Sequence, residues 1–158
     1  HFDGMVTIVN KLFDSTNPQF AFFGEKDFQQ LTILKQYVGK AKLPIEIVGV
    51  PTVRDENQLA LSSRNSRLSD HGLELAAHIP IALEIVALAT KSGVDISLAR
   101  QSGIDYLRQF KEINIDYLEI TDEHMELNPT SEDARVLVAV TIEDVRLLDN
   151  FPIHIRNA

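Results

Sequence analysis

Apolar residues in the first third of the chain follow helical and extended patterns in turn. Residues 4–14 carry apolar side chains at helical spacing, which predicts an amphipathic helix. Apolar runs at 20–23 and 45–50 predict strands, and the first is wholly apolar, as in a strand buried on both faces of a parallel sheet. A helical pattern over 27–39 separates them. Strand, helix and strand in this order predict a parallel βαβ unit.

The rest of the chain predicts helices followed by strands. Ser69 is a candidate N-cap, and residues 73–90 are apolar at helical spacing around Pro80. Because proline interrupts a helix interior, this stretch is either one kinked helix or two abutting helices. A weaker helical pattern covers 95–110, where Gly103 lowers helix propensity. Strand patterns follow, the last two close enough for an antiparallel hairpin, at 113–121, 135–141 and 145–148.

These patterns predict an α/β chain with two domains. Residues 1–66 should form a partial, Rossmann-like nucleotide-binding domain around the parallel βαβ unit. Residues 67–158 should form a small carboxy-terminal α+β lid domain with an antiparallel three-stranded sheet.

Composition narrows the range of partners. A formal net charge of -8 opposes binding to nucleic acid, which requires a basic face. No continuous apolar run approaches the ~20 residues of a membrane span, so we expect no membrane partner. The absence of cysteine fits a reducing compartment, and we expect a cytoplasmic protein. The five histidines show no metal-ligand spacing, so no protein metal site is expected.

A polar cluster follows the first predicted strand. Gly24, Glu25, Lys26 and Asp27 stand between that strand and the next helix, where backbone N–H groups favour anions and Lys26 adds a positive charge. The alternative is a solvated lysine in the first helical turn. Glu25 and Asp27 suit Mg²⁺ beside phosphates, or simply interact with the helix dipole. Gln30 lies in the same first turn, pointing towards the site or exposed to solvent.

A second polar cluster follows the second predicted strand. Residues 53–65 read as a hairpin or an ordered loop that carries Ser62, Ser63 and Arg64. Two hydroxyls and a guanidinium are suitable donors for phosphate oxygens, although an ordinary polar loop capped by Asn65 has the same composition. Parallel strands end at the same edge of a sheet, so we expect Lys26 and Arg64 to contact one triphosphate.

Three separated blocks resemble a known family. Residues 23–30 read FGEKDFQQ, residues 48–54 read VGVPTVR and residues 59–65 read LALSSRN. Together they resemble the pantothenate synthetase family, the pantoate-β-alanine ligases. Residues 1–4 are similar to that family's His-Phe-x-Gly segment, and the resemblance extends along all 158 residues as its carboxy-terminal half.

The resemblance implies an ATP-dependent ligase on a nucleotidyltransferase-type fold. In that family ATP and pantoate give pantoyl adenylate and pyrophosphate, β-alanine then displaces AMP, and Mg²⁺ is the expected cofactor. By resemblance Lys26, Ser62 and Arg64 are the catalytic residues and Gln30 binds pantoate. The implied ATP-binding set is Gly24, Glu25, Lys26, Asp27, Val53, Leu61, Ser62, Ser63 and Arg64.

Two departures from the family shape the expectations. The family's amino-terminal half, with its His-x-Gly-His motif, is missing, so we expect the isolated chain to be inactive and the apolar strand at Phe20 to need a partner, as in a homodimer. Gln58 stands where the family often has glycine. Two alternatives remain open: another adenylate-forming nucleotidyltransferase, which need not use Gln30 for a hydroxy acid, and a non-catalytic association module.

Overall fold

The computed structural model describes residues 2–127 and 129–156. The chain divides into two compact units, His1–Thr52 and Val53–Ala158. Residues 53–66, which were predicted to belong to the first domain, therefore lie in the second unit. The cause is burial of apolar side chains, since Leu59 and Ala60 are 5% and 3% exposed and Leu59 belongs to the core of the second unit. The roles of the two parts, nucleotide binding and lid, stay a prediction.

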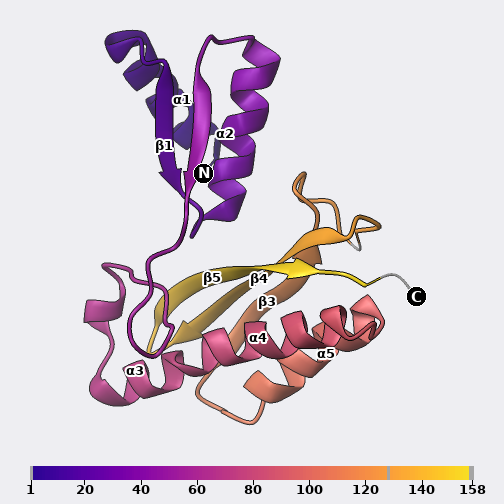
Figure 1. The fold of residues 1–158 in the computed structure, drawn as a ribbon. Helices are drawn as coiled ribbons and strands as arrows, with labels where there is room; N and C mark the ends of the chain where they lie inside the picture. Colours follow the sequence, from indigo (N-terminus) through magenta and orange to yellow (C-terminus); the bar gives the residue numbers. More distant parts are fainter. Residues whose placement is uncertain (1, 128, 157–158) are drawn as a thin grey trace. The chain divides into compact units, whose positions relative to one another are not determined.

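The first unit is a parallel βαβ unit preceded by a helix (Figure 1). Its elements are α1 (Phe2–Thr16), β1 (Phe20–Gly24), α2 (Phe28–Ala41) and β2 (Glu46–Val50). The two strands pair in parallel, with Phe20 opposite Glu46 and Gly24 opposite Val50. The predicted strand, helix and strand order and the parallel pairing are confirmed.

The small sheet of this unit is covered on one face. Val9 and Phe13 of α1 pack with Leu34 and Val38 of α2, together with the strand residues Ala21, Phe23 and Ile47. Side chains alternate between the faces of a strand, so Phe20 and Phe22 point the other way and are 51% and 67% exposed. The prediction that β1 is buried on both faces is therefore wrong for the described chain.

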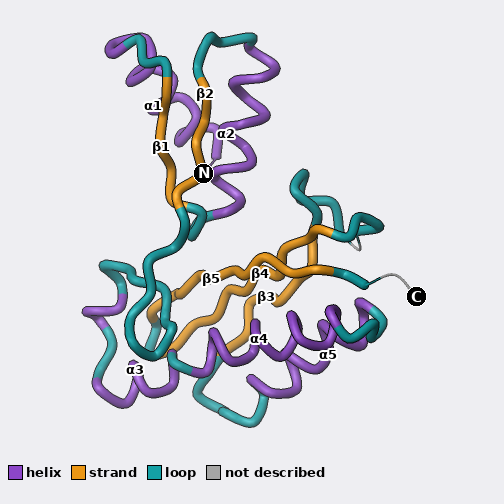
Figure 2. Tube along the Cα trace, in the orientation of Figure 1, coloured by secondary structure: helices purple, strands orange, loops and turns teal. Residues whose placement is uncertain are grey.

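The second unit packs three helices against an antiparallel sheet (Figure 2). After a short 3₁₀ helix (Asn65–Arg67), its elements are α3 (Asp70–Ala76), α4 (His78–Lys91), α5 (Ile96–Leu107), β3 (Asn114–Thr121), β4 (Asp133–Ile142) and β5 (Val145–His154). The strand order is β3-β4-β5, and both pairings are antiparallel as predicted. Glu143 and Asp144, at φ 49° and 62°, form the two-residue turn of the last hairpin.

Local chemistry explains the helix boundaries in this unit. Pro80 lies in the first turn of α4, where its missing N–H has no helical partner to lose, so the alternative of two abutting helices is correct. Ser69 is the N-cap of α3, and its Oγ accepts a hydrogen bond from the Gly72 N–H at 3.1 Å. Gly103 allows α5 to approach α4, because a Cβ there would lie 2.6 Å from Val86 Cγ2.

The helical stretch Asp70–Lys91 is also long and apolar enough to cross a membrane, by length and composition alone. However, 44% of its most apolar window is buried inside the unit. Ile79, Leu83 and Val86 are at most 1% exposed and form the centre of the core. Packing in the core therefore accounts for this composition.

Candidate functional site

The turn between β1 and α2 extends the parallel pairing of the strands. The Glu25 N–H donates to the Val50 carbonyl at 2.8 Å, one residue beyond the last pair, Gly24 and Val50. The Glu25 side chain lies over Gly49, where an added Cβ would be 3.0 Å from Glu25 Oε1. Lys26 follows in the turn and is half-buried. The predicted cluster therefore lies at the carboxyl edge of the small sheet, where α/β proteins bind ligands.

Asp27 begins the helix that follows this turn. Its Oδ1 accepts a hydrogen bond from the Gln30 N–H at 3.1 Å, which makes Asp27 the N-cap of α2. The sequence left two roles open for Asp27, Mg²⁺ binding or an interaction with the start of the helix. Asp27 makes the second kind of interaction as the N-cap. Gln30 is a half-buried residue of the first turn, on the same corner as Lys26.

The segment after β2 is a small hairpin in the second unit. Arg54 and Ala60 form an antiparallel bridge, and the Leu61 N–H donates to the Val53 carbonyl at 2.9 Å. At its tip, Asp55 Oδ1 accepts hydrogen bonds from two backbone N–H groups, both at 2.9 Å. The hairpin interpretation of this segment is correct.

The two faces of the hairpin differ in character. Arg54 points towards Asp149 of the sheet, and its bridge partner Ala60 is 3% exposed. Their neighbours Val53 and Leu61 point the other way and are 66% and 51% exposed. Two apolar side chains are therefore presented to solvent, and one of them, Leu61, directly precedes Ser62.

The Ser62–Arg64 segment is ordered by short-range and tertiary hydrogen bonds. Ser62 Oγ accepts from the Arg64 N–H at 3.2 Å, and Asn65 Nδ2 donates to the Ala60 carbonyl at 3.1 Å. Arg64 Nη1 donates to the carbonyl of Arg146 at the start of β5, at 3.0 Å. The Ser63 and Arg64 side chains are exposed, so polar donors and the two apolar side chains share one accessible stretch.

The predicted site residues thus fall into two groups. The first unit brings together Gly24, Glu25, Lys26, Asp27 and Gln30, and the second brings together Val53, Leu61, Ser62, Ser63 and Arg64. That Lys26 and Arg64 bind one triphosphate together stays a prediction. In the described part of the chain, no three His, Asp or Glu side chains gather as a metal-binding group.

The residues that attach the hairpin to the sheet were not among the predicted site residues. Arg54 forms a two-pronged ion pair with Asp149 of β5, and both N···O distances are 2.8 Å. Asp149 and Asn150 are 3% and 2% exposed. The signal was present, since two adjacent polar residues continue the apolar pattern of the last strand, but the position of their partner follows only from the tertiary structure.

Burial and hydrogen bonding shift two pKa values in the second unit. Burial lowers the pKa of His78 below its ordinary value of 6.5, because desolvation penalises the charged imidazolium. Hydrogen bonds from the Ser69 hydroxyl and N–H lower the pKa of Glu143 below 4.5. Both groups belong to the framework of the unit and neither is among the predicted site residues.

Known proteins with similar sequences and structures point to one class of protein. A crystal structure of pantothenate synthetase from Thermus thermophilus matches at a TM-score of 0.91 and 39% identity, over 96% of this chain and 55% of that one. A Francisella tularensis pantoate-β-alanine ligase, described as complexed with beta-gamma ATP and β-alanine, matches at a TM-score of 0.69 and 30% identity, over 96% and 50%. The fold is therefore of the nucleotidyltransferase type.

Sequence comparison then gives the family. The profile of the family described as Pantoate-beta-alanine ligase matches residues 1–152. Pantothenate synthetases from Cytophaga hutchinsonii and Aquifex aeolicus are each 40% identical over 97% of the chain, which covers 56% and 55% of their own lengths. The chain belongs to the pantoate-β-alanine ligase family and spans about half the length of these relatives.

Proposed function

We propose that an intact ligase containing this chain joins pantoate and β-alanine in two steps at the expense of ATP. In the first step a pantoate carboxylate oxygen attacks the α-phosphorus and pyrophosphate leaves. In the second the β-alanine amine attacks the acyl carbon of pantoyl adenylate, the amide bond forms and AMP leaves. The observation that carries this proposal is the family match over residues 1–152, which includes both polar clusters.

The chemistry of the two clusters supports individual roles. The Lys26 ammonium and Arg64 guanidinium would neutralise charge on the leaving pyrophosphate, and Ser62 and Ser63 would donate hydroxyl hydrogen bonds. Gly24, Glu25 and Asp27 shape the corner that holds Lys26, and Gln30 would hydrogen-bond pantoate. Exposed Val53 and Leu61 offer an apolar surface to the adenine.

Magnesium is the expected cofactor, and the donor set suggests how it would be held. One carboxylate oxygen of Asp27 already accepts the Gln30 N–H, and the Glu25 side chain packs over Gly49. Mg²⁺ takes few protein ligands and binds phosphate oxygens, so we assign it mainly to ATP. Bound there, it would make pyrophosphate a better leaving group.

We also propose that the ligase is a cytoplasmic homodimer and that this chain alone has no turnover. Exposed Phe20 and Phe22 support the need for a covering partner, either the rest of the ligase or a second copy. Sedimentation of the intact ligase checks the dimer, and assay of the isolated chain checks its inactivity.

The test of the function is pantoate-dependent exchange of labelled pyrophosphate into ATP by the intact ligase. We expect exchange that requires pantoate and Mg²⁺ and no β-alanine, because adenylation is the first step. Exchange with a different acid only would favour another adenylate-forming enzyme. Absence of exchange with every acid, together with unchanged MgATP calorimetry in Lys26→Ala, would favour a non-catalytic module.

A further inference from the structure

Arg54 makes hydrogen bonds, an ion pair and a ring contact within the second unit. Its Nη1 and Nη2 donate to Asp149 Oδ2 and Oδ1, both at 2.8 Å, and Nη2 also donates to the Asn150 carbonyl at 3.1 Å. The guanidinium lies 4.4 Å from the centre of the Phe151 ring. Planar, two-pronged pairing with simultaneous stacking is a property of arginine that lysine lacks.

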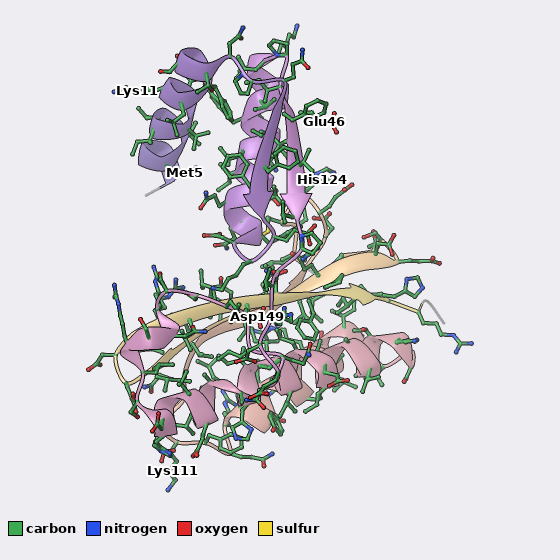
Figure 3. The ribbon with its side chains drawn as sticks, turned by 60° about the vertical axis from the view of Figure 1, so that its left-hand side comes forward. Met5, Lys11, Glu46, Lys111, His124 and Asp149 are labelled. Atoms are coloured by element: carbon green, nitrogen blue, oxygen red, sulfur yellow. The ribbon has the colours of Figure 1, made fainter. Side chains whose placement is uncertain are left out.

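The partners of Arg54 belong to a hydrogen-bonded strand. Asp149 lies in β5, as Figure 3 shows, and pairs with Val138 of β4. Its side chain is 1% exposed, and its Oδ1 also accepts the Asn150 N–H at 2.7 Å. Phe151 follows two residues later on the same face of β5, which lets one guanidinium meet both side chains.

The contacts of Arg54 also determine the path of the hairpin. Its Nη1 donates to the Gln58 carbonyl at 2.9 Å, inside the hairpin itself. Ala60, the bridge partner of Arg54, is followed directly by Leu61 and then by the Ser62–Arg64 segment. A shift of Arg54 relative to β5 would therefore displace the residues that we propose to bind phosphate.

We propose that Arg54 is a positioning residue, which holds the Ser62–Arg64 segment in its phosphate-binding position through Asp149 and Phe151. Arg54 acts through the hairpin and need not touch ATP. This inference rests on the proposed function of Ser62–Arg64. Misplacement of a binding group by about 1 Å is enough to reduce turnover by about a hundredfold, so a well-fixed anchor has a clear consequence.

The test compares Arg54→Lys and Asp149→Asn with a matched control in the intact ligase. Arg54→Lys keeps a positive charge beside Asp149, so the fold should survive while the two-pronged geometry is lost. The control is Arg100→Lys, since Arg100 also forms a two-pronged ion pair, through Nε and Nη2 with Glu119 at 2.8 and 2.6 Å, away from the hairpin. An ion pair that contributes only to stability would leave the KM for ATP unchanged at both positions.

Two readouts decide the inference. We expect the KM for ATP to rise about tenfold or more in Arg54→Lys and Asp149→Asn, the KM for β-alanine to stay within about twofold, and Arg100→Lys to match wild type. Hydrogen exchange of residues 53–64 without substrates should be about tenfold faster in both hairpin variants. An unchanged KM for ATP, or an equal rise in Arg100→Lys, would overturn the role in positioning.

The hydrogen-exchange measurement separates this inference from the proposed function. A wild-type ligase without pantoate-dependent exchange would contradict the function, whereas unchanged protection of residues 53–64 in Arg54→Lys would overturn the anchoring itself.

Discussion

The two units bury their apolar side chains to different extents. In the second unit every α-helix and strand contributes to one core, with Leu83, Val86 and Val138 at most 1% exposed. In the first unit the core lies between two helices and one face of a two-stranded sheet, and Phe20 and Phe22 remain exposed on the other face. We therefore expect the second unit to be stable by itself and the exposed face of the first unit to need a covering partner.

The largest expected difference between the units concerns core truncation in the 158-residue chain. Leu83→Ala removes a fully enclosed side chain from the second unit and should lower the free energy of unfolding by about 2–5 kcal/mol. Phe22→Ala removes a side chain that is 67% exposed and should change it by less than about 0.5 kcal/mol. Urea denaturation followed by circular dichroism measures both. A large loss in Phe22→Ala would mean that this face is covered in solution.

A second contrast uses one glycine from each unit. Gly103→Ala should destabilise the second unit by about 1–3 kcal/mol, because the new methyl group would lie 2.6 Å from Val86 and 3.2 Å from the Ala82 carbonyl. A Cβ added at Gly39 in α2 would have no neighbour within 4 Å, so Gly39→Ala should stabilise the first unit by about 0.5–1 kcal/mol. Thermal unfolding and hydrogen exchange resolved by unit would show the opposite signs, and a stabilising Gly103→Ala would refute the close helix contact.

The hairpin at the start of the second unit has an unfavourable backbone conformation at Gln58. Its φ of 64° is left-handed, which glycine adopts without penalty, so Gln58→Gly should stabilise the unit by about 0.5–1 kcal/mol. Asn57→Gly is the control, because Asn57 is not among the residues with positive φ and only unfolded-state entropy should change. A gain in melting temperature for Asn57→Gly and none for Gln58→Gly would contradict this assignment.

The smallest expected effect is a pH dependence confined to the second unit. His78 stacks on Phe110 with ring centres 3.7 Å apart, and burial lowers its pKa. As the pH falls through 6.5, the unfolded chain takes up the proton first, so the free energy of unfolding decreases towards pH ~5.5. His78→Phe should flatten this slope. Denaturation at pH ~7.5 and ~5.5 measures it, above the range where Glu143 titrates, and equal slopes would show that His78 is not the group responsible.

Local patterns predicted most of the fold. Apolar spacing was sufficient for the βαβ unit and the order of the later elements, and cap residues such as Ser69 set a helix start. The last strand was predicted to end at 148 but extends to His154, since Asp149 is made compatible with burial by Arg54 and Pro152 occupies an edge strand. That ion pair spans 95 residues of sequence, so no local pattern indicates it.

The local structure around the two candidate clusters was predictable for the same reason, while their role in binding stays a prediction. Gly24–Asp27 stands between a strand and a helix, and Ser62–Arg64 follows a turn-rich segment. The residues next to each cluster are therefore enough to predict its local structure. The exposure of Phe20 and Phe22 was not predictable, because an apolar run has the same pattern whether one face is covered or both.

The most direct test of the account is MgATP binding to the intact ligase by calorimetry, with Lys26→Ala and Arg64→Ala measured separately. If an ammonium from one unit and a guanidinium from the other contact the same triphosphate, each variant should bind about tenfold or more weakly, as expected for loss of a charged hydrogen bond. Lys40→Ala removes the same charge from the far end of α2, and Arg67→Ala removes it from the 3₁₀ helix that follows Arg64, so both variants should bind like wild type. Wild-type affinity in either Lys26→Ala or Arg64→Ala would contradict the shared site.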